Sequence, residues 1–250
     1  MKKLFTLLLG IAVAVSASAQ YVCTKQGSVF NYSKTVYDDN KKTEFTDKLT
    51  VSKVSTGADG LVTVEMTEDV METNNRLNSA TNKSTATYNP ADTTTVYNMG
   101  DAESTIDELI ESVRQEAAQA GHSLSQADLD KIRGSIKAKG ELLLKVNPNY
   151  AAGAKQPNQT LRIDLGMMGK ITTNLWEIKC EGSETIEVPA GKFDCIKMSC
   201  VLRQSAMNKT DKIYQTIWYA EGIGEVKSTA ADKKGNILGE QILLSYALAE

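Results

Sequence analysis

Apolar and polar residues alternate along much of the chain. In the stretch 45–54, Leu49 and Val51 share one face while polar residues occupy the other, which is the period-2 pattern of a strand with one wet face. The stretches 29–37 and 61–66 are built in the same way, and turn-forming residues separate the three. This part of the chain therefore predicts consecutive antiparallel strands.

Residues 72–100 are rich in threonine and asparagine and predict a solvated loop or an exposed hairpin. Within them, the short runs 84–88 and 93–97 flank the sequence Asn89-Pro90-Ala91-Asp92. A proline at the second position suits a type I turn, which favours the hairpin.

The pattern changes to a helical period between residues 103 and 139. Gly121 ends the first apolar stripe, Ser125 and Asp128 form a capping box at the start of the second, and Gly140 ends it. Each helix then has one apolar stripe to bury against a sheet. The stripes consist of Ile106, Leu109, Ile110, Val113 and Ala117, then Leu129, Ile132 and Ile136.

The chain returns to strand patterns after Gly140 and keeps them to its end. These runs are separated by turns or loops, without crossover helices, which favours an antiparallel arrangement. We expect a mainly β fold, an antiparallel curved sheet or open β-barrel with a two-helix insert, in which residues 20–250 form one domain with the insert at about 103–139. The expected strands are 141–146, 161–165, 171–180, 184–188, 193–202, 212–219, 224–228 and 237–246.

The first nineteen residues are typical of a signal peptide. Two lysines precede an apolar run, and Ala17-Ser18-Ala19 is a cleavage site before Gln20. We therefore expect an exported protein of the periplasm or cell envelope, with no transmembrane segment after cleavage. Cys23 lies too far from the cut for a lipid anchor.

Charge and composition restrict the partners. Of 28 basic residues, cleavage removes two lysines, so 26 remain against 31 acidic ones. An acidic chain without a basic cluster argues against nucleic acid as a partner. With a single histidine, His122, and no nucleotide-binding or nucleophile motif, we expect no catalytic residues, metal ligands or cofactor.

Four cysteines remain in the exported chain, and two states are open. Cys195 and Cys200 lie on one strand, too far apart to bridge each other. Mirroring the hairpin about residues 190–191 places Cys180 opposite Val201, next to Cys200, so a bulge could close a Cys180–Cys200 disulfide. The alternative is a set of reduced, buried thiols.

Two stretches of the second half have a more specific sequence than their pattern requires. Residues 184–197 (ETIEVPAGKFDCIK) and 218–227 (WYAEGIGEVK), with 27–34 and the turn 232–236, resemble the TapB-like family of exported Gram-negative proteins. The resemblance covers about two thirds of the mature chain and excludes the helical insert and the threonine-rich segment. It implies a barrel-like envelope protein of unknown function and supplies no catalytic residues.

Glycines 222 and 224 within the second of these stretches indicate a bulge or bend. The neighbouring Trp218 and Tyr219 either belong to the core and girdle of the bent sheet or line a ligand cavity.

Two classes of function remain. The favoured class is a non-catalytic module that binds an apolar or glycan ligand or assists an envelope protein in assembly or secretion. The alternative is an envelope hydrolase whose carboxylate pair has no sequence motif. If the barrel is hollow, we expect the helical insert to act as its lid.

Overall fold

The structure of the protein is a computed structural model that describes residues 20–38, 41–166, 169–206 and 209–250. The predicted leader, residues 1–19, lies outside the described residues. The N-terminal strands are β1 (Val29–Asp38), β2 (Lys41–Thr56), β3 (Val62–Glu72), β4 (Asn75–Asn89) and β5 (Thr94–Asp101). The helices α2 (Ala102–Gln119) and α3 (Gln126–Ser135) follow. The remaining strands are β6 (Lys137–Lys139), β7 (Glu141–Val146), β8 (Gln159–Asp164), β9 (Lys170–Val188), β10 (Gly191–Ala206), β11 (Lys209–Ala220), β12 (Gly224–Ala231) and β13 (Ile237–Ala247).

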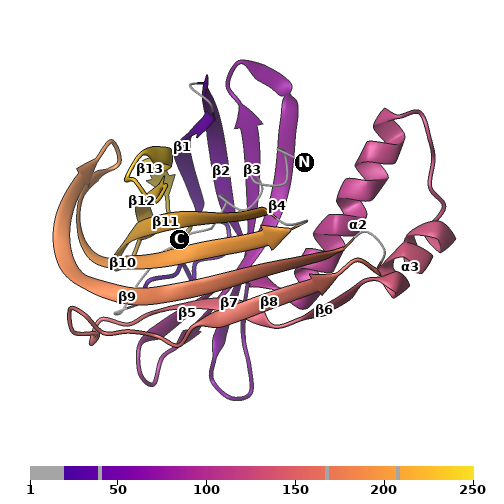
Figure 1. The fold of residues 1–250 in the computed structure, drawn as a ribbon. Helices are drawn as coiled ribbons and strands as arrows, with labels where there is room; N and C mark the ends of the chain where they lie inside the picture. Colours follow the sequence, from indigo (N-terminus) through magenta and orange to yellow (C-terminus); the bar gives the residue numbers. More distant parts are fainter. Residues whose placement is uncertain (1–19, 39–40, 167–168, 207–208) are drawn as a thin grey trace.

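Within the described residues, thirteen antiparallel strands form one sheet in the order β6-β8-β9-β10-β11-β12-β13-β1-β2-β3-β4-β5-β7. The sheet curls into a nearly closed barrel, with β9 to β11 crossing in front of the N-terminal strands (Figure 1). The expected fold class is therefore confirmed. The first and last strands pair along their length, since Phe30 lies opposite both Leu49 of β2 and Tyr246 of β13.

Two glutamine side chains join the edges of the sheet, β7 and the segment around β8. The amide of Gln159 accepts from the backbone N–H of Leu143 and donates to the carbonyl of the same residue. Gln156 contacts Lys145 in the same way, at 3.0 Å and 2.6 Å. A side-chain amide has the donor and acceptor of a peptide group, so the two glutamines substitute for a missing strand ladder.

The N-terminal segment closes one end of the barrel. Tyr21, Val22 and Cys23 are buried there, and the backbone N–H of Tyr21 donates to the hydroxyl of Thr95 at 3.0 Å. The carbonyl of Gln20 accepts from Gly222 at 3.2 Å. The other end, where β1 and β12 finish and β13 begins, is the one we call the open end.

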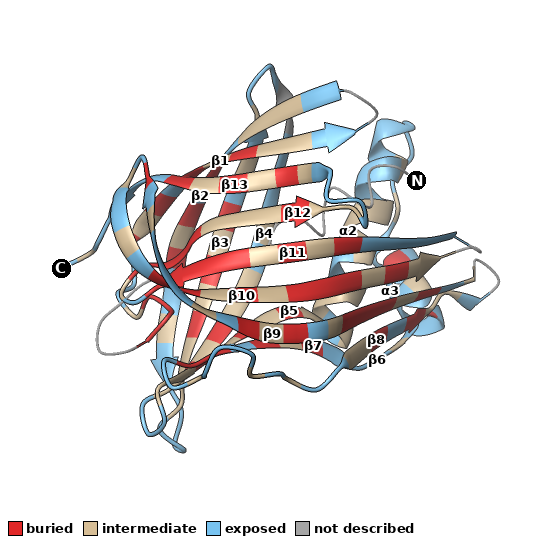
Figure 2. Cartoon of the chain, turned by 60° about the vertical axis from the view of Figure 1, so that its left-hand side comes forward, coloured by how far each residue is buried: buried red, intermediate tan, exposed pale blue. Residues whose placement is uncertain are grey.

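Along the strands, buried residues alternate with partly buried or exposed ones, as the sequence pattern predicts (Figure 2). The buried residues are those that face the interior. Leu49 and Val51 are both buried, which confirms their common inward face. They belong to a core that includes fully buried Phe30, Tyr32 and Tyr97.

The helical pair packs on the rim of the sheet. Ile106, Leu109, Ile110 and Ile132 pack against a small cluster of Ile136, Ile163 and Ile171, so both predicted stripes do have an apolar partner. Asp101 caps α2, and the predicted capping box of Ser125 and Asp128 starts α3. Arg133 of α3 forms an ion pair with Asp107 of α2.

The second helix is shorter than predicted. It ends at Ser135, and residues 137–139 form strand β6, paired with β8. Gly134 weakens the end of this helix, and the backbone of Lys137–Lys139 gains a ladder with Arg162–Asp164 instead.

The hairpin predicted around Pro90 is confirmed, because β4 and β5 pair from Asn89 opposite Thr94 onward. The loop interpretation of residues 72–100 is wrong, because β4 extends from Asn75 to Asn89 and pairs with β3 along most of its length. Threonine is favoured in strands, and the pairing with β3 satisfies the polar backbone. Gly222 lies in the turn between β11 and β12 and Gly224 is the first residue of β12, with φ of 70° and 82°, so the chain bends where these glycines predicted a bulge or bend.

Candidate functional site

Five buried polar residues meet inside the barrel, and we call them the polar centre. Lys34, Asp47, Glu68, Glu225 and Gln241 come from β1, β2, β3, β12 and β13 respectively. Each is at most 5% exposed. Burying three carboxyl groups against one ammonium is costly unless each finds partners, so this arrangement is unusual for a core.

Local strand geometry explains why these side chains point inward. On β1, the buried residues Phe30, Tyr32 and Lys34 occupy every second position. On β3, Val64, Met66 and Glu68 do the same. In an antiparallel pair every second residue faces the same side. Because the apolar residues of such a series face the interior, a polar residue in the same series faces the interior as well.

The contacts within the polar centre are few and long. The ammonium of Lys34 lies 3.6 Å from Oδ2 of Asp47. Asn82 of β4 donates to Glu68 at 3.2 Å, and Gln241 donates to Oε1 of Glu225 at 3.4 Å.

Several buried oxygen atoms among the described residues have no hydrogen-bond partner. They are Oδ1 and Oδ2 of Asp47, Oε2 of Glu225, Oε1 of Gln241 and the hydroxyls of Tyr97 and Tyr219. An unsatisfied buried polar atom costs about 1–3 kcal/mol, and native structures contain few of them. Their concentration in one place indicates a site that receives donors from outside the protein.

Burial changes the protonation of the carboxyl groups. Desolvation raises the pKa of Glu225 to about 8, with Glu68 and Asp47 adding to the rise and Ser228 and Lys34 opposing it. Desolvation also raises the pKa of Asp47 to about 6, against the lowering effect of Lys34. At neutral pH, Glu225 is thus mostly protonated and Asp47 mostly ionised, and groups with such perturbed pKa values occur preferentially at functional sites.

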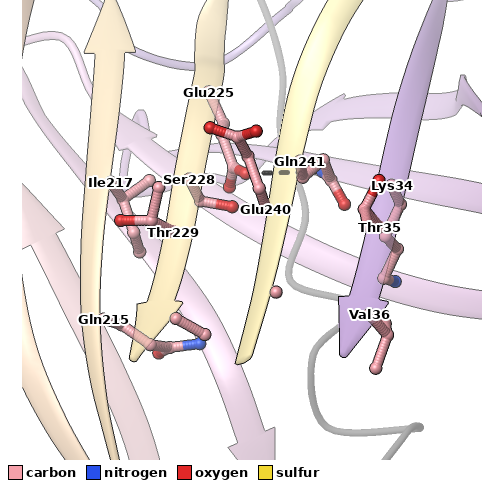
Figure 3. A pocket seen from close by; sticks show the side chains of 12 residues that line it. Lys34, Thr35, Val36, Gln215, Ile217, Glu225, Ser228, Thr229, Glu240 and Gln241 are labelled. Carbon is pink, nitrogen blue, oxygen red and sulfur yellow. Dashed lines mark hydrogen bonds between the residues drawn. The ribbon is translucent and has the colours of Figure 1, made fainter. Parts of the chain in front are cut away.

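A small cavity adjoins the polar centre (Figure 3). Its volume is about 20 Å³, and Lys34, Gln215, Glu225 and Gln241 contribute to its lining. This volume holds about one water molecule. On the side toward the open end, the cavity is lined by Ala230 and Gly239, which are cross-strand partners with little or no side chain.

A second hollow lies against strands β9 to β11, beside the segment 155–158. Its volume is about 680 Å³, and Lys179, Glu181 and Tyr214 help to line it. Glu177, which also lines it, has a φ of 52°. The described side chains here are paired with one another, as in the contacts of Glu181 with Lys179 at 2.7 Å and Ser199 at 2.6 Å. The polar centre is therefore the stronger candidate.

Trp218 and Tyr219, the predicted ligand-binding residues, lie on opposite faces of β11. The ring of Trp218 is covered by the ammonium groups of Lys197 at 4.9 Å and Lys227 at 5.9 Å, and its N–H donates to Glu184. Tyr219 is fully buried and stacks on Tyr97 at 4.8 Å. The two residues do not line a common cavity, and a contact of either with a ligand stays a prediction.

All four cysteines are buried and free in this structure. Cys180 lies opposite Met198, and two irregularities interrupt the pairing between β9 and β10. The predicted register, with Cys180 opposite Val201, is wrong because the turn is centred one residue earlier and the bulges shift the strands further. The sulfur atoms of Cys180 and Cys200 instead contact the Tyr150 carbonyl and the Gln215 side chain, each at 3.7 Å.

The sequence reasoning did not single out the polar centre. One signal was available, because Asp47 lies on the same strand face as Leu49 and Val51. Glu225 lies within the stretch 218–227 that carries the resemblance. No spacing along the chain connects β1–β3 with β12 and β13, so the cluster itself depends on barrel closure.

The described part of the chain contains no group of three or more His, Cys, Asp or Glu side chains arranged to hold a metal ion. It also has no helix that is both long and apolar enough to cross a membrane. The described residues form a nearly closed, barrel-like antiparallel sheet with a buried polar cluster in its core, and solved structures of other proteins agree on the fold.

A family model described as DUF3108-like matches residues 142–243, which include both stretches 184–197 and 218–227. No curated protein matches the chain. Among solved structures, a candidate lipoprotein from Parabacteroides distasonis ATCC 8503 is 13% identical with a TM-score of 0.62, over 94% of this chain and 100% of that one. A candidate exported protein with a YmcC-like fold from Bacteroides fragilis NCTC 9343 is 17% identical with a TM-score of 0.60, over the same shares.

Proposed function

We propose that the protein is a non-catalytic, exported module of the periplasm or cell envelope that binds a small ligand inside its barrel. The TapB-like resemblance and the descriptions of the two similar structures support export. The observation that carries the proposal is the set of unpartnered, fully buried oxygen atoms in the polar centre.

These atoms also favour one ligand chemistry. Carboxyl and amide oxygens accept hydrogen bonds, so the ligand must present donors. A glycan, with its hydroxyl groups, meets this condition and an apolar ligand does not. Of the two expected ligands, the glycan is therefore preferred.

The hydrolase alternative has candidate groups in Asp47 and Glu225, whose pKa values are separated as in an acid–base pair. A glycosidase must place the scissile bond of a sugar ring between its two carboxyl groups. The cavity of about 20 Å³ admits a single donor group of a saccharide, such as one hydroxyl, but not a sugar ring. Binding is the better-supported function.

The test is a thermal-shift assay on the chain from residue 20 onward, with N-acetylglucosamine, its disaccharide and palmitate as probes. We expect a saccharide to raise the melting temperature by about 2 °C or more at saturation, and palmitate to have no effect. Asp47→Asn should weaken the shift, whereas Glu65→Gln, on the exposed outer face of β3, should not. A shift with palmitate alone would overturn the polar-ligand assignment, and no shift with any probe would favour the accessory role in envelope assembly or secretion.

A further inference from the structure

Several acceptor atoms in the polar centre lack a donor. Four carboxyl or amide oxygen atoms there lack a donor: two of Asp47, one of Glu225 and one of Gln241. The nearest fixed cation, Lys34, reaches only Asp47, at 3.6 Å. The bound group must therefore bring several donors at once.

The charge of the enclosure is also unbalanced. Even with Glu225 protonated, Asp47 and Glu68 provide two further carboxyl groups around the single ammonium of Lys34. A buried anionic group is stable only when a cation or several donors compensate it. A ligand that is both cationic and rich in N–H groups satisfies both requirements.

The cavity limits the size of the entering group. Its volume of about 20 Å³ beside Glu225 and Gln241 admits one water-sized group (Figure 3). The small pair Ala230 and Gly239 lines the side toward the strand ends, so the tip of a ligand can enter while its body stays at the open end.

We propose that the polar centre binds the protonated primary amine of a small ligand, such as an amino sugar or an aminoalkyl headgroup. This inference rests on the proposed ligand-binding function and names the chemistry of the site. A primary ammonium has three donors and one charge in the volume of a water molecule. A quaternary ammonium has no donors, and a guanidinium is larger than the cavity.

Binding of the ammonium releases the proton of Glu225. The groups that face Glu225 are Lys34 and Tyr32 of β1, Asp47 of β2, Glu68 of β3, Tyr97 of β5 and Tyr219 of β11. With its pKa near 8, the Glu225 carboxyl carries a proton at pH 7. The entering ammonium stabilises the carboxylate, so the proton leaves to solvent and the ligand keeps its own.

The experiment is titration calorimetry at pH 7 on the chain from residue 20 onward. The probes are glucosamine and phosphoethanolamine, each compared with its N-acetyl derivative. We expect at least one amine to bind about tenfold or more tightly than its acetylated form, because acetylation removes the charge and two donors. The better of the two amines shows whether the source is a sugar or a lipid-type headgroup.

Two further readouts separate a direct role from a structural one. Glu225→Gln should weaken amine binding about tenfold or more, and Glu65→Gln should leave it unchanged. In wild-type protein, repeating the titration in buffers of different ionisation enthalpy should reveal about one proton released per amine bound, a measurement that needs no variant.

Equal binding of amine and N-acetyl forms, or binding of the amine without proton release, would overturn the amine assignment and leave the proposed ligand-binding function standing. Failure of every saccharide and amine to bind would overturn both.

Discussion

At the scale of single residues, several polar side chains face the interior of this barrel because they share a strand face with apolar residues. Lys34 and Glu68 each occupy the next inward position after two apolar ones, and Asp47 occupies the inward position before two apolar ones. Burial raises the pKa of Asp47 and of Glu225 in the same cluster, which makes the stability of the protein depend on pH.

Glu225 allows a direct test of that dependence. Its pKa rises from 4.5 in the unfolded chain to about 8 in the folded protein, so the folded state binds the extra proton. The contribution of Glu225 to the free energy of unfolding should then be complete below pH 4.5 and be lost as the pH rises through 8, a loss of about 5 kcal/mol.

We expect Glu225→Gln to remove this part of the fall, so that the variant gains stability relative to wild type between pH 5 and pH 9. Urea unfolding at the two pH values measures the difference, with Glu65→Gln as the exposed control. Parallel losses of stability in wild type and Glu225→Gln would show that Glu225 is not protonated in the fold.

At the scale of elements, the seam of the barrel is the feature that regular pairing does not explain. Gln156 and Gln159 hold β7 through its own backbone groups. The helical pair lies against the rim on a small isoleucine cluster, and its role as a lid stays a prediction.

The seam can be opened by substitution. Changing both glutamines to alanine leaves the N–H and carbonyl groups of Leu143 and Lys145 without partners, at a cost of about 1–3 kcal/mol for each group that stays buried. We expect faster hydrogen exchange at these two amides, measured by mass spectrometry or NMR, together with lower stability. Gln115→Ala, on the exposed face of α2, is the matched control. Unchanged exchange at Leu143 and Lys145 would show that other contacts close the barrel.

At the scale of the whole molecule, the pairing of β1 with β13 joins the two ends of the chain. Asn31 lies opposite Ser245 on the exposed side, and its amide donates to that hydroxyl at 3.1 Å. The strands before and after the helical insert therefore form one continuous sheet.

A disulfide at this position tests the closure. We expect Asn31→Cys combined with Ser245→Cys to cross-link under mild oxidation and to stabilise the protein by about 2–4 kcal/mol, because the bridge closes a very long loop in the unfolded chain. Melting temperatures with and without reductant measure the gain, and Asn31→Cys alone controls for the substitution. Absence of a cross-link would contradict the observed register.

The amino-acid sequence by itself determined much of the local structure: most strand segments other than β6 and the first part of β4, where the two helices begin, and which strand faces are apolar. These features depend on residues close together in the chain, through the period of apolar positions and the capping box of Ser125 and Asp128. The sequence also determined that Asp47 and Glu225 lie in strand segments, but not that they meet.

Only the tertiary structure decided that meeting, because β1–β3 and β12–β13 become neighbours when the sheet closes on itself. The tertiary structure likewise decided the register between β9 and β10, in which Cys180 does not lie opposite its predicted partner. It also decided that strand β6 replaces the end of the second helix. Bulges and closure depend on how many strands pack around one interior, and this is a property of the whole sheet that no local pattern encodes.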